Sequence, residues 1–147
     1  MNSETLKATA EREVQEAFSQ WLQGARAKDA DAILACYANE VIAYDAILQL
    51  QFKGLNAYGQ HWRNCLEMCG GDGIFEPQEP TILVDRELAV LHCLVRCGGE
   101  QDGEIKTSWM RGTQCYVKRD GRWKIVHEHF SAPFDIESGK ALFELQP

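Results

Sequence analysis

Four residues in this chain of 147 have side chains suited to acid–base chemistry: Asp45, Arg111, His127 and His129. Asp45 lies in a strand predicted over Val41 to Leu48, whose alternation turns its carboxylate toward the apolar face. A carboxylate in such a place can act as a general base, because burial raises its pKa and a neighbouring cation lowers it. The alternative is a structural ion pair with Arg111 or a histidine, and the sequence leaves both open.

Arg111 and the two histidines define the chemistry that could accompany such a base. The guanidinium of Arg111 presents a fork of donors that can stabilise a carboxylate or an enolate oxygen. His127 and His129 alternate onto one face, where they could relay protons or serve as hydrogen-bonded framework residues. No further ligands at a fixed spacing accompany them, so we predict no metal. The lack of a glycine-rich phosphate loop predicts no cofactor.

The register of the last predicted hairpin decides whether these three side chains point inward. A two-residue loop at Asp120-Gly121 would mix polar and apolar residues on both faces. A three-residue loop that also includes Arg119 shifts the pairing by one residue, which inverts every side chain of one strand. This second register separates polar from apolar residues better, so we predict it. It places Arg111 and both histidines on the inner face and turns Glu128 away.

Helices come first along the chain and strands follow them. The spacing of apolar residues predicts helices over Glu4–Lys28, Asp31–Tyr37 and Leu55–Met68. Alternation and turn residues predict strands over Val41–Leu48, Ile74–Val84, Leu88–Cys97, Ile105–Lys118 and Arg122–Phe130. This order predicts an α+β fold in which helices cover one face of a mostly antiparallel sheet. The length fits a single domain over residues 1–147.

Composition and charge argue against several classes of protein. The net charge is −7, so the basic surface that is typical of nucleic-acid-binding proteins is absent. No apolar run reaches the ~20 residues that cross a membrane, and no apolar segment follows the first residues as in a signal peptide. We therefore expect a cytoplasmic protein whose six cysteines are reduced.

The closing segment carries a recognisable pattern: Asp-Gly, a basic residue and Trp at 120–123, then His-x-His-x-Ser at 127–131 before Pro133. It resembles the last hairpin of SnoaL-like proteins, also called nuclear transport factor 2-like proteins. It looks especially like the association domain of calcium/calmodulin-dependent kinase II and its stand-alone bacterial relatives. Residues 28–38 and 44–54 also fit, so the resemblance spans nearly the whole chain. It implies a cone-shaped fold, in which helices on a curved sheet enclose one pocket, and dimers that pair through their sheets.

Several side chains are expected to line the pocket that this resemblance implies. They are five aromatic residues and one threonine: Trp21, Tyr44, Tyr58, Trp62, Trp109 and Thr113. In a cone-shaped fold, aromatic side chains can be core residues and ligand-binding residues at once. We therefore predict a small, mostly apolar ligand that carries a carbonyl or a carboxylate.

Ketosteroid isomerase is the informative enzyme for comparison within this superfamily. Asp45 resembles its catalytic base in sequence context, and Trp21 falls where its oxyanion-hole tyrosine lies. The second oxyanion donor of that enzyme, a protonated Asp, lies on a strand that corresponds to residues 109–116, which contain no carboxylate here. The resemblance therefore implies that the base is present and that both oxyanion donors are missing.

Two functions from different classes remain open. The first is an isomerase or cyclase in which Asp45 is the base, Arg111 stabilises the developing charge and a histidine relays protons. The second is a non-catalytic ligand-binding or oligomerisation domain that resembles the kinase association domain. In both cases we expect a homodimer or a higher oligomer, built on the outer sheet face through Tyr116, Val126 and Phe130.

Overall fold

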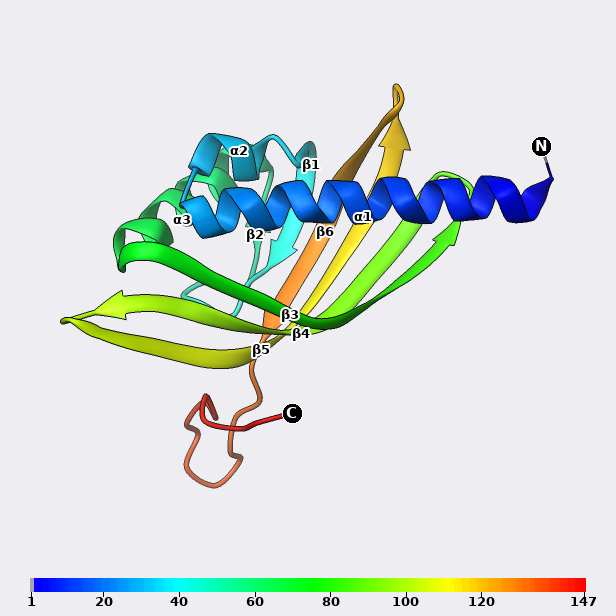
Figure 1. Ribbon diagram of the computed structural model, residues 1–147. Coiled ribbons are helices and arrows are strands. Elements are labelled where there is room, and N and C mark those ends of the chain that lie inside the picture. The colour runs from blue at the N-terminus through cyan, green and yellow to red at the C-terminus, as the bar shows by residue number, and fades with distance from the viewer. Residues whose placement is uncertain (1) are drawn as a thin grey trace.

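The computed structural model describes residues 2–147, which form three helices packed on one six-stranded sheet (Figure 1). The helices are α1 (Ser3–Ala27), α2 (Ala30–Leu34) and α3 (Leu55–Glu67). The strands are β1 (Tyr37–Tyr44), β2 (Phe52–Lys53), β3 (Gly70–Asp85), β4 (Leu88–Gln101), β5 (Glu104–Arg119) and β6 (Arg122–Ser131). The predicted α+β class is confirmed. The short strand β2 was not predicted, and β1 begins four residues earlier than expected.

The sheet is curved and open, with the strand order β2-β1-β6-β5-β4-β3. β1 and β6 run parallel, whereas all other neighbouring strands in this order run antiparallel. The three helices lie on the same side of the sheet, and α1 crosses over its concave face (Figure 1). The opposite face carries no helix.

The helix α1 is the main cover of this concave face. It begins after Asn2, whose side chain accepts a hydrogen bond from the backbone N–H of Thr5 at 2.8 Å. It ends at Lys28, which adopts a left-handed conformation with φ of 56°. Residues at helical spacing are buried against the sheet: Val14, Phe18, Trp21 and Ala25. Each large apolar side chain buried in this way stabilises the fold by roughly 1.5–3 kcal/mol.

The inner sheet face supplies the other half of the core. Its buried residues alternate along the strands and include Val41, Ala43, Ala89, Leu91, Tyr116 and Ile125. The alternation predicted for the first strand is thus observed, since Val41 and Ala43 point inward and Tyr44 points outward. Asp45 follows β1 by one residue and lies at the inner side, where the strand leaves the sheet.

The hairpin between β5 and β6 differs from the prediction. Arg119 pairs with Arg122, so the loop has two residues, and the predicted three-residue loop is wrong. Both central residues have positive φ, 52° at Asp120 and 76° at Gly121. A two-residue turn with positive φ at both positions matches the right-handed twist of the flanking strands, so the hairpin closes without a longer loop.

A β-bulge at Val126 then sets which side chains face the helices. Tyr116 pairs with Ile125, but Cys115 pairs with His127, so one extra residue lies on β6. Beyond it, Gln114 pairs with Glu128, and both of these side chains are buried on the inner face. The prediction that Glu128 points away is therefore wrong. The predicted register was chosen because it separated polar from apolar residues better, whereas here the inner face buries polar groups that satisfy one another.

Two further expectations concern the cysteines, which were predicted to be reduced, and the lack of a membrane-spanning segment. No disulfide links any of the six cysteines, which all lie among the described residues. Burial raises the pKa of Cys93 to about 11 and, together with the charge of Asp45, the pKa of Cys97 to about 12. Because the thiolate is the reactive form, these two thiols are expected to be inert at neutral pH. None of the described helices combines the length and the apolar character needed to cross a membrane.

Candidate functional site

Asp45 and His61 form a buried pair of acid–base groups. The carboxylate Oδ2 of Asp45 lies 2.6 Å from Nε2 of His61. The Asp45 side chain is 14% exposed and the His61 side chain is 6% exposed. The partner of Asp45 is therefore a histidine of α3, and not Arg111. Shielding from water strengthens such a contact relative to a surface pair.

The spacing of residues on α3 fixes the position of His61. Tyr58, His61, Trp62 and Cys65 follow one another at i, i+3, i+4 and i+7, so they share one helix face. The imidazole stacks on the ring of Phe52 from β2, with centroids 4.1 Å apart and planes inclined by 25°. The Cys65 sulfur lies 3.6 Å from Nε2 and 3.9 Å from Nδ1 of the same ring, so it contacts the ring edge beside Asp45. The ring is thus held in one orientation.

This pair lies on the wall of a cavity of about 130 Å³ between α3 and the inner sheet face. The lining residues are Asp45, Ile47, Tyr58, His61, Trp62, Cys65, Phe75, Cys97, Met110 and Phe130. Most of these side chains are apolar or aromatic, and no lysine or arginine is among them. An apolar cavity with a few convergent polar groups is typical of a small-molecule site.

Trp62, another residue of the cavity wall, carries a polar atom that is unpaired within the described chain. Its Nε1 is buried and has no hydrogen-bond partner among residues 2–147. The indole packs edge-on against Trp21 and Tyr58, with ring centroids 6.0 Å and 6.2 Å away. Buried polar atoms are nearly always paired, so an unpaired donor on a residue of the cavity wall requires an explanation.

A polar network centred on Glu128 lies behind the same wall. Oε2 of Glu128 accepts hydrogen bonds from the hydroxyl of Tyr37 at 2.7 Å and from the hydroxyl of Tyr58. Oε1 accepts from Nε2 of Gln114 at 2.7 Å. Two outer bonds extend the network: Trp21 donates to Tyr37 at 2.9 Å, and Tyr116 donates to Gln114 at 2.6 Å. The network joins α1, α3 and the strands β1, β5 and β6.

Burial dominates the ionisation of this network. It raises the pKa of Glu128 to about 7, although the hydrogen bonds from Tyr58, Tyr37 and Gln114 oppose the shift. Burial, assisted by the negative charge of Glu128, also raises the pKa of Tyr37 and Tyr58 well above their ordinary value. The tyrosines therefore remain protonated donors at neutral pH, while Glu128 can change its charge there.

The other three predicted catalytic residues do not join this pair. Arg111, His127 and His129 point to the outer sheet face, because the register and the bulge differ from the prediction. Nε of Arg111 donates to the hydroxyl oxygen of Ser131 at 3.2 Å, and Nδ1 of His127 lies 2.6 Å from the carbonyl oxygen of Ile42. These contacts are those of framework residues, so the predicted inward orientation of all three is wrong.

The predicted ligand-binding residues divide into three groups. Tyr58 and Trp62 line the cavity beside Asp45, and their predicted role in ligand binding stays a prediction. Trp109 and Thr113 lie on the outer face, where Thr113 and Arg111 line a separate hollow of about 520 Å³. Their predicted inward orientation is wrong for the same reason as that of Arg111. Trp21 is a core residue that contacts cavity-lining rings but is itself engaged with Tyr37.

Tyr44 and His129 do not line the inner cavity but lie next to it. Together with Asp45 they line an outer recess of about 500 Å³, which the C-terminal segment borders through Phe143. The Tyr44 ring lies 5.8 Å from the ring of His129 and 4.7 Å from that of His127. Asp45 and Phe130 line both this recess and the inner cavity.

Two functional candidates were missed, and one of them left a signal in the sequence. His61 lies at helical spacing between aromatic residues of the α3 stripe, which marks a histidine on a buried face. Glu128 left no comparable signal, because its orientation depends on the Val126 bulge. A bulge shifts the register by one residue without a distinctive composition.

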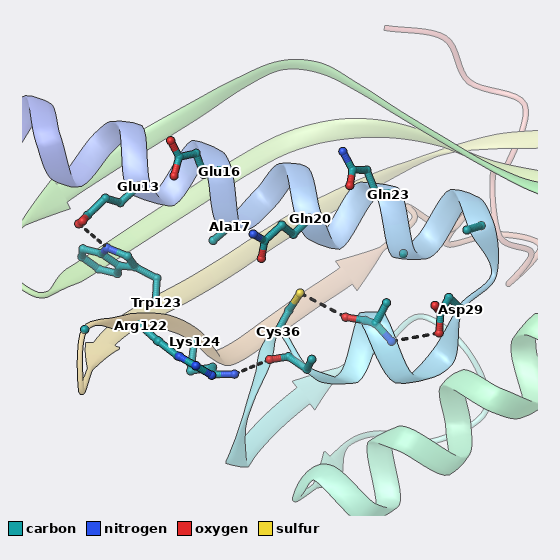
Figure 2. A pocket seen from close by; sticks show the side chains of 15 residues that line it. Glu13, Glu16, Ala17, Gln20, Gln23, Asp29, Cys36, Arg122, Trp123 and Lys124 are labelled. Atoms are coloured by element: carbon teal, nitrogen blue, oxygen red, sulfur yellow. Dashed lines mark hydrogen bonds between the residues drawn. The ribbon is translucent and has the colours of Figure 1, made fainter.

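Figure 2 shows a different and larger hollow, of about 800 Å³, between α1, α2 and the turn of the β5–β6 hairpin. Acidic and basic side chains share its walls, and several already have partners. Glu13 accepts from Nε1 of Trp123 at 3.0 Å and from Lys118 at 3.1 Å, while Lys124 donates to the carbonyl oxygen of Ala35. Because these groups satisfy one another, we place the candidate site at Asp45 and His61. No group of three or more metal-ligating side chains occurs within residues 2–147.

Helices on a curved sheet with a cavity between them define a pocket-bearing α+β fold. The chain belongs to the SnoaL-like domain family, whose family model matches residues 14–135. The crystal structure of an NTF2-like protein of unknown function from Pseudomonas putida KT2440 is 42% identical, with a TM-score of 0.88. That similarity covers 95% of this chain and 98% of the Pseudomonas chain. The resemblance seen in the closing hairpin is therefore confirmed.

Two more distant structures share the fold. A Xanthomonas campestris protein, provisionally named a calcium/calmodulin dependent protein kinase II association domain, is 20% identical with a TM-score of 0.72, over 91% of this chain and 89% of that one. A Novosphingobium aromaticivorans DSM 12444 protein, provisionally named scytalone dehydratase, is 13% identical with a TM-score of 0.73, over 86% and 85%. The comparison with curated protein sequences gave no match.

Proposed function

We propose that this SnoaL-like protein is an acid–base enzyme that moves a proton on a small, mostly apolar carbonyl compound. The observation that carries the proposal is the Asp45–His61 pair, 2.6 Å apart, on the wall of an apolar cavity. A base on the wall of an apolar cavity, largely shielded from water, is well suited to remove a weakly acidic proton. Asp45 is the proposed base, as the sequence indicated, and His61 replaces His127 or His129 as its partner.

The proposed reaction begins with proton removal next to a carbonyl group. Asp45 takes the proton, and the electron pair of the broken C–H bond forms the carbon–carbon double bond of an enolate. The imidazole of His61 donates to Asp45 through Nε2, which orients the carboxylate toward the substrate. Return of the proton at another carbon completes an isomerisation. In a substrate with a β-hydroxyl group, the enolate would instead expel that group, which takes the proton held by Asp45 and leaves as water. This is a dehydration, the reaction named for the Novosphingobium relative.

A test of this proposal uses a one-ring substrate, 3-cyclohexenone, whose isomerisation yields the conjugated 2-cyclohexenone with a strong ultraviolet absorbance. The protein is expected to accelerate this conversion well beyond the same concentration of the double variant Asp45→Asn/His61→Gln. That control keeps every other carboxylate and histidine of the protein, so its rate measures non-specific base catalysis. Equal rates for the two proteins would refute the proposed acid–base function.

We also propose that the protein is a homodimer built on the outer sheet face. The face carries no helix and exposes apolar side chains, including Ile42, Leu83 and Leu94. Tyr116 and Phe130, which we expected there, instead lie on the inner side: Tyr116 is fully buried and Phe130 lines the cavity. The interface proposed here is therefore formed by residues of β1, β3 and β4 on the same sheet face. An uncovered apolar sheet face is a common association surface.

The substitution Leu94→Glu tests this interface. Leu94 lies on the outer side of β4, opposite Arg111 of β5, and is 38% exposed. A carboxylate buried in a dimer interface loses its hydration, and an ion pair with Arg111 does not repay that cost in full, so the variant is expected to be a monomer. Light scattering at micromolar concentration measures the mass. Leu48→Glu is the matched control, because Leu48 is 84% exposed on the loop after β1. A wild-type monomer, or a Leu94→Glu dimer, would contradict the proposed interface.

A further inference from the structure

The size of the inner cavity limits what it can hold. Its volume is about 130 Å³. An engineered apolar cavity of ~150 Å³ in another protein takes up one benzene molecule. The cavity beside Asp45 is therefore matched to a single six-membered ring, and a ligand with several fused rings would require the walls to move apart. Closely packed walls resist such a movement.

The walls of the cavity also limit the charge of the ligand. Phe75, Met110 and Phe130 present apolar surfaces, and no lysine or arginine lines the cavity. A carboxylate ligand would lie beside Asp45 with no lysine or arginine to offset the repulsion between the two charges, and the one nearby imidazole, that of His61, is already engaged with Asp45. An uncharged ligand is therefore favoured, which narrows the expected chemistry from a carbonyl or a carboxylate to a carbonyl alone.

The unpaired N–H donor of Trp62 supplies a polar group that could bind the oxygen of a carbonyl ligand. Trp62 is 8% exposed, it lines the cavity, and its Nε1 has no partner among the described residues. An indole N–H is a donor only, so its partner must be an acceptor such as a carbonyl or enolate oxygen. The apolar walls would strengthen a hydrogen bond of this kind relative to one in water.

We infer that the cavity binds an uncharged carbonyl compound of one six-membered ring, whose oxygen accepts a hydrogen bond from Nε1 of Trp62. The binding claim stands on the cavity and the indole donor, and the reaction rests on the proposed function. In that reaction, Asp45 breaks the C–H bond beside the carbonyl group and the electron pair moves toward the oxygen. The enolate charge then develops at the atom that faces the Trp62 donor. Trp62 would thus supply an oxyanion donor that the comparison with ketosteroid isomerase indicated was missing.

Binding of fluorinated aromatic probes, measured by ¹⁹F NMR titration, tests the size limit of the cavity and the hydrogen bond to its donor separately. The probes are 4-fluorophenol, fluorobenzene and 6-fluoro-2-naphthol. The wild-type protein is expected to bind 4-fluorophenol about tenfold more tightly than fluorobenzene, a difference of about 1.4 kcal/mol. The two-ring naphthol is expected to bind more weakly than 4-fluorophenol. Equal binding of 4-fluorophenol and fluorobenzene, or tighter binding of the naphthol, would overturn the inference without any variant.

The substitution Trp62→Phe identifies the donor. It keeps an aromatic ring but removes the N–H, so 4-fluorophenol should bind about as weakly as fluorobenzene. Fluorobenzene binding should change less than about threefold, which also shows that the variant is folded. Trp109→Phe is the control, because Trp109 lies on the outer face and should leave all affinities unchanged. Retention of the preference for 4-fluorophenol in Trp62→Phe would refute the role of the indole.

The two proposals can fail independently. If the probes bind as expected but 3-cyclohexenone is not isomerised, the ligand class stands and the acid–base function is withdrawn. If 3-cyclohexenone is isomerised in an Asp45-dependent manner while Trp62→Phe retains full activity and phenol affinity, the function stands and the inference about Trp62 is withdrawn.

Discussion

Replacing Asp45 by Asn is expected to lower the rate of 3-cyclohexenone isomerisation about 100- to 10,000-fold, the usual contribution of a general base. Asn has nearly the same shape as Asp, and its carbonyl oxygen can still accept from Nε2 of His61, which lies 2.6 Å from the carboxylate. The hydrogen bond that holds the pair is therefore retained. What is lost is the ability to bind the substrate proton, so the variant separates catalysis from packing.

The stability of the same variant distinguishes a catalytic role from a structural one. Because the bond to His61 is kept, the free energy of unfolding should change by only about 1 kcal/mol. For a chain of this size, that corresponds to a few degrees in the thermal midpoint. Asp31→Asn is the control, because Asp31 forms a surface ion pair with Arg63. A loss of several kcal/mol with unchanged turnover would show that Asp45 is a structural residue, and its catalytic assignment would be withdrawn.

Glu128 is expected to make the protein less stable as the pH rises from about 4.5 to about 7. The carboxyl group has an ordinary pKa of 4.5 in the unfolded chain and a pKa of about 7 in the folded protein. Between these values the folded state holds a proton that the unfolded state has released, so raising the pH favours unfolding. The contribution is complete below pH 4.5 and is lost as the pH passes through 7. Its size is about 3 kcal/mol.

Glu128→Gln provides the matched measurement, because glutamine has nearly the same volume and does not titrate. Urea unfolding between pH 5 and 8 should give a falling stability for the wild type and a flatter profile for the variant. The groups that face Glu128 are Tyr37 from β1, Tyr58 from α3 and Gln114 from β5, with Asp45 also close enough to influence its charge. They are common to both proteins, so the difference between the two profiles isolates Glu128. Parallel profiles would contradict the raised pKa.

Carboxylates with a lowered pKa should not obscure the loss of stability that Glu128 causes between pH 4.5 and 7. Hydrogen bonds from Trp123 and Lys118 lower the pKa of Glu13, and a hydrogen bond from Arg119 lowers the pKa of Glu40. Groups of this kind contribute stability above their unfolded pKa and lose it as the pH falls through the folded value. Their effects therefore lie below about pH 4.5, on the acidic side of the Glu128 transition.

The helices α1 and α3 could be predicted from the sequence because each has several turns of apolar periodicity, whereas the five-residue α2 was predicted as Asp31–Tyr37 and is Ala30–Leu34. The predicted bounds Glu4–Lys28 and Leu55–Met68 differ by one residue at most at each end from α1 and α3. The sheet order and the parallel pairing of β1 with β6 could not be read in this way, since they depend on contacts between distant segments. The family resemblance supplied the fold where local patterns did not.

The site was predicted less completely, because the pairing between β5 and β6 was predicted in the wrong register. Asp45, Tyr58 and Trp62 were correctly expected at the cavity, because β1 alternates regularly and α3 has a clear stripe. The residues of β5 and β6 were placed on the wrong faces. The Asp120-Gly121 pair was a reliable signal for a two-residue turn, but it was outweighed by the assumption that the inner face is apolar. The bulge at Val126 and the buried Glu128 network invalidate that assumption.

The pairing of β1 with β6 also determines when the site can form during synthesis. Tyr37 and Glu128 are separated by 91 positions in the chain, and their hydrogen bond links the first strand to the last. The hairpins of β3 to β6 close short loops, whereas β1 must wait for β6 before it acquires its long neighbour in the sheet. On the ribosome, α1, α3 and Asp45 therefore emerge well before the strand that completes the wall behind the cavity. The nascent chain remains without a finished cavity until its last strand is released.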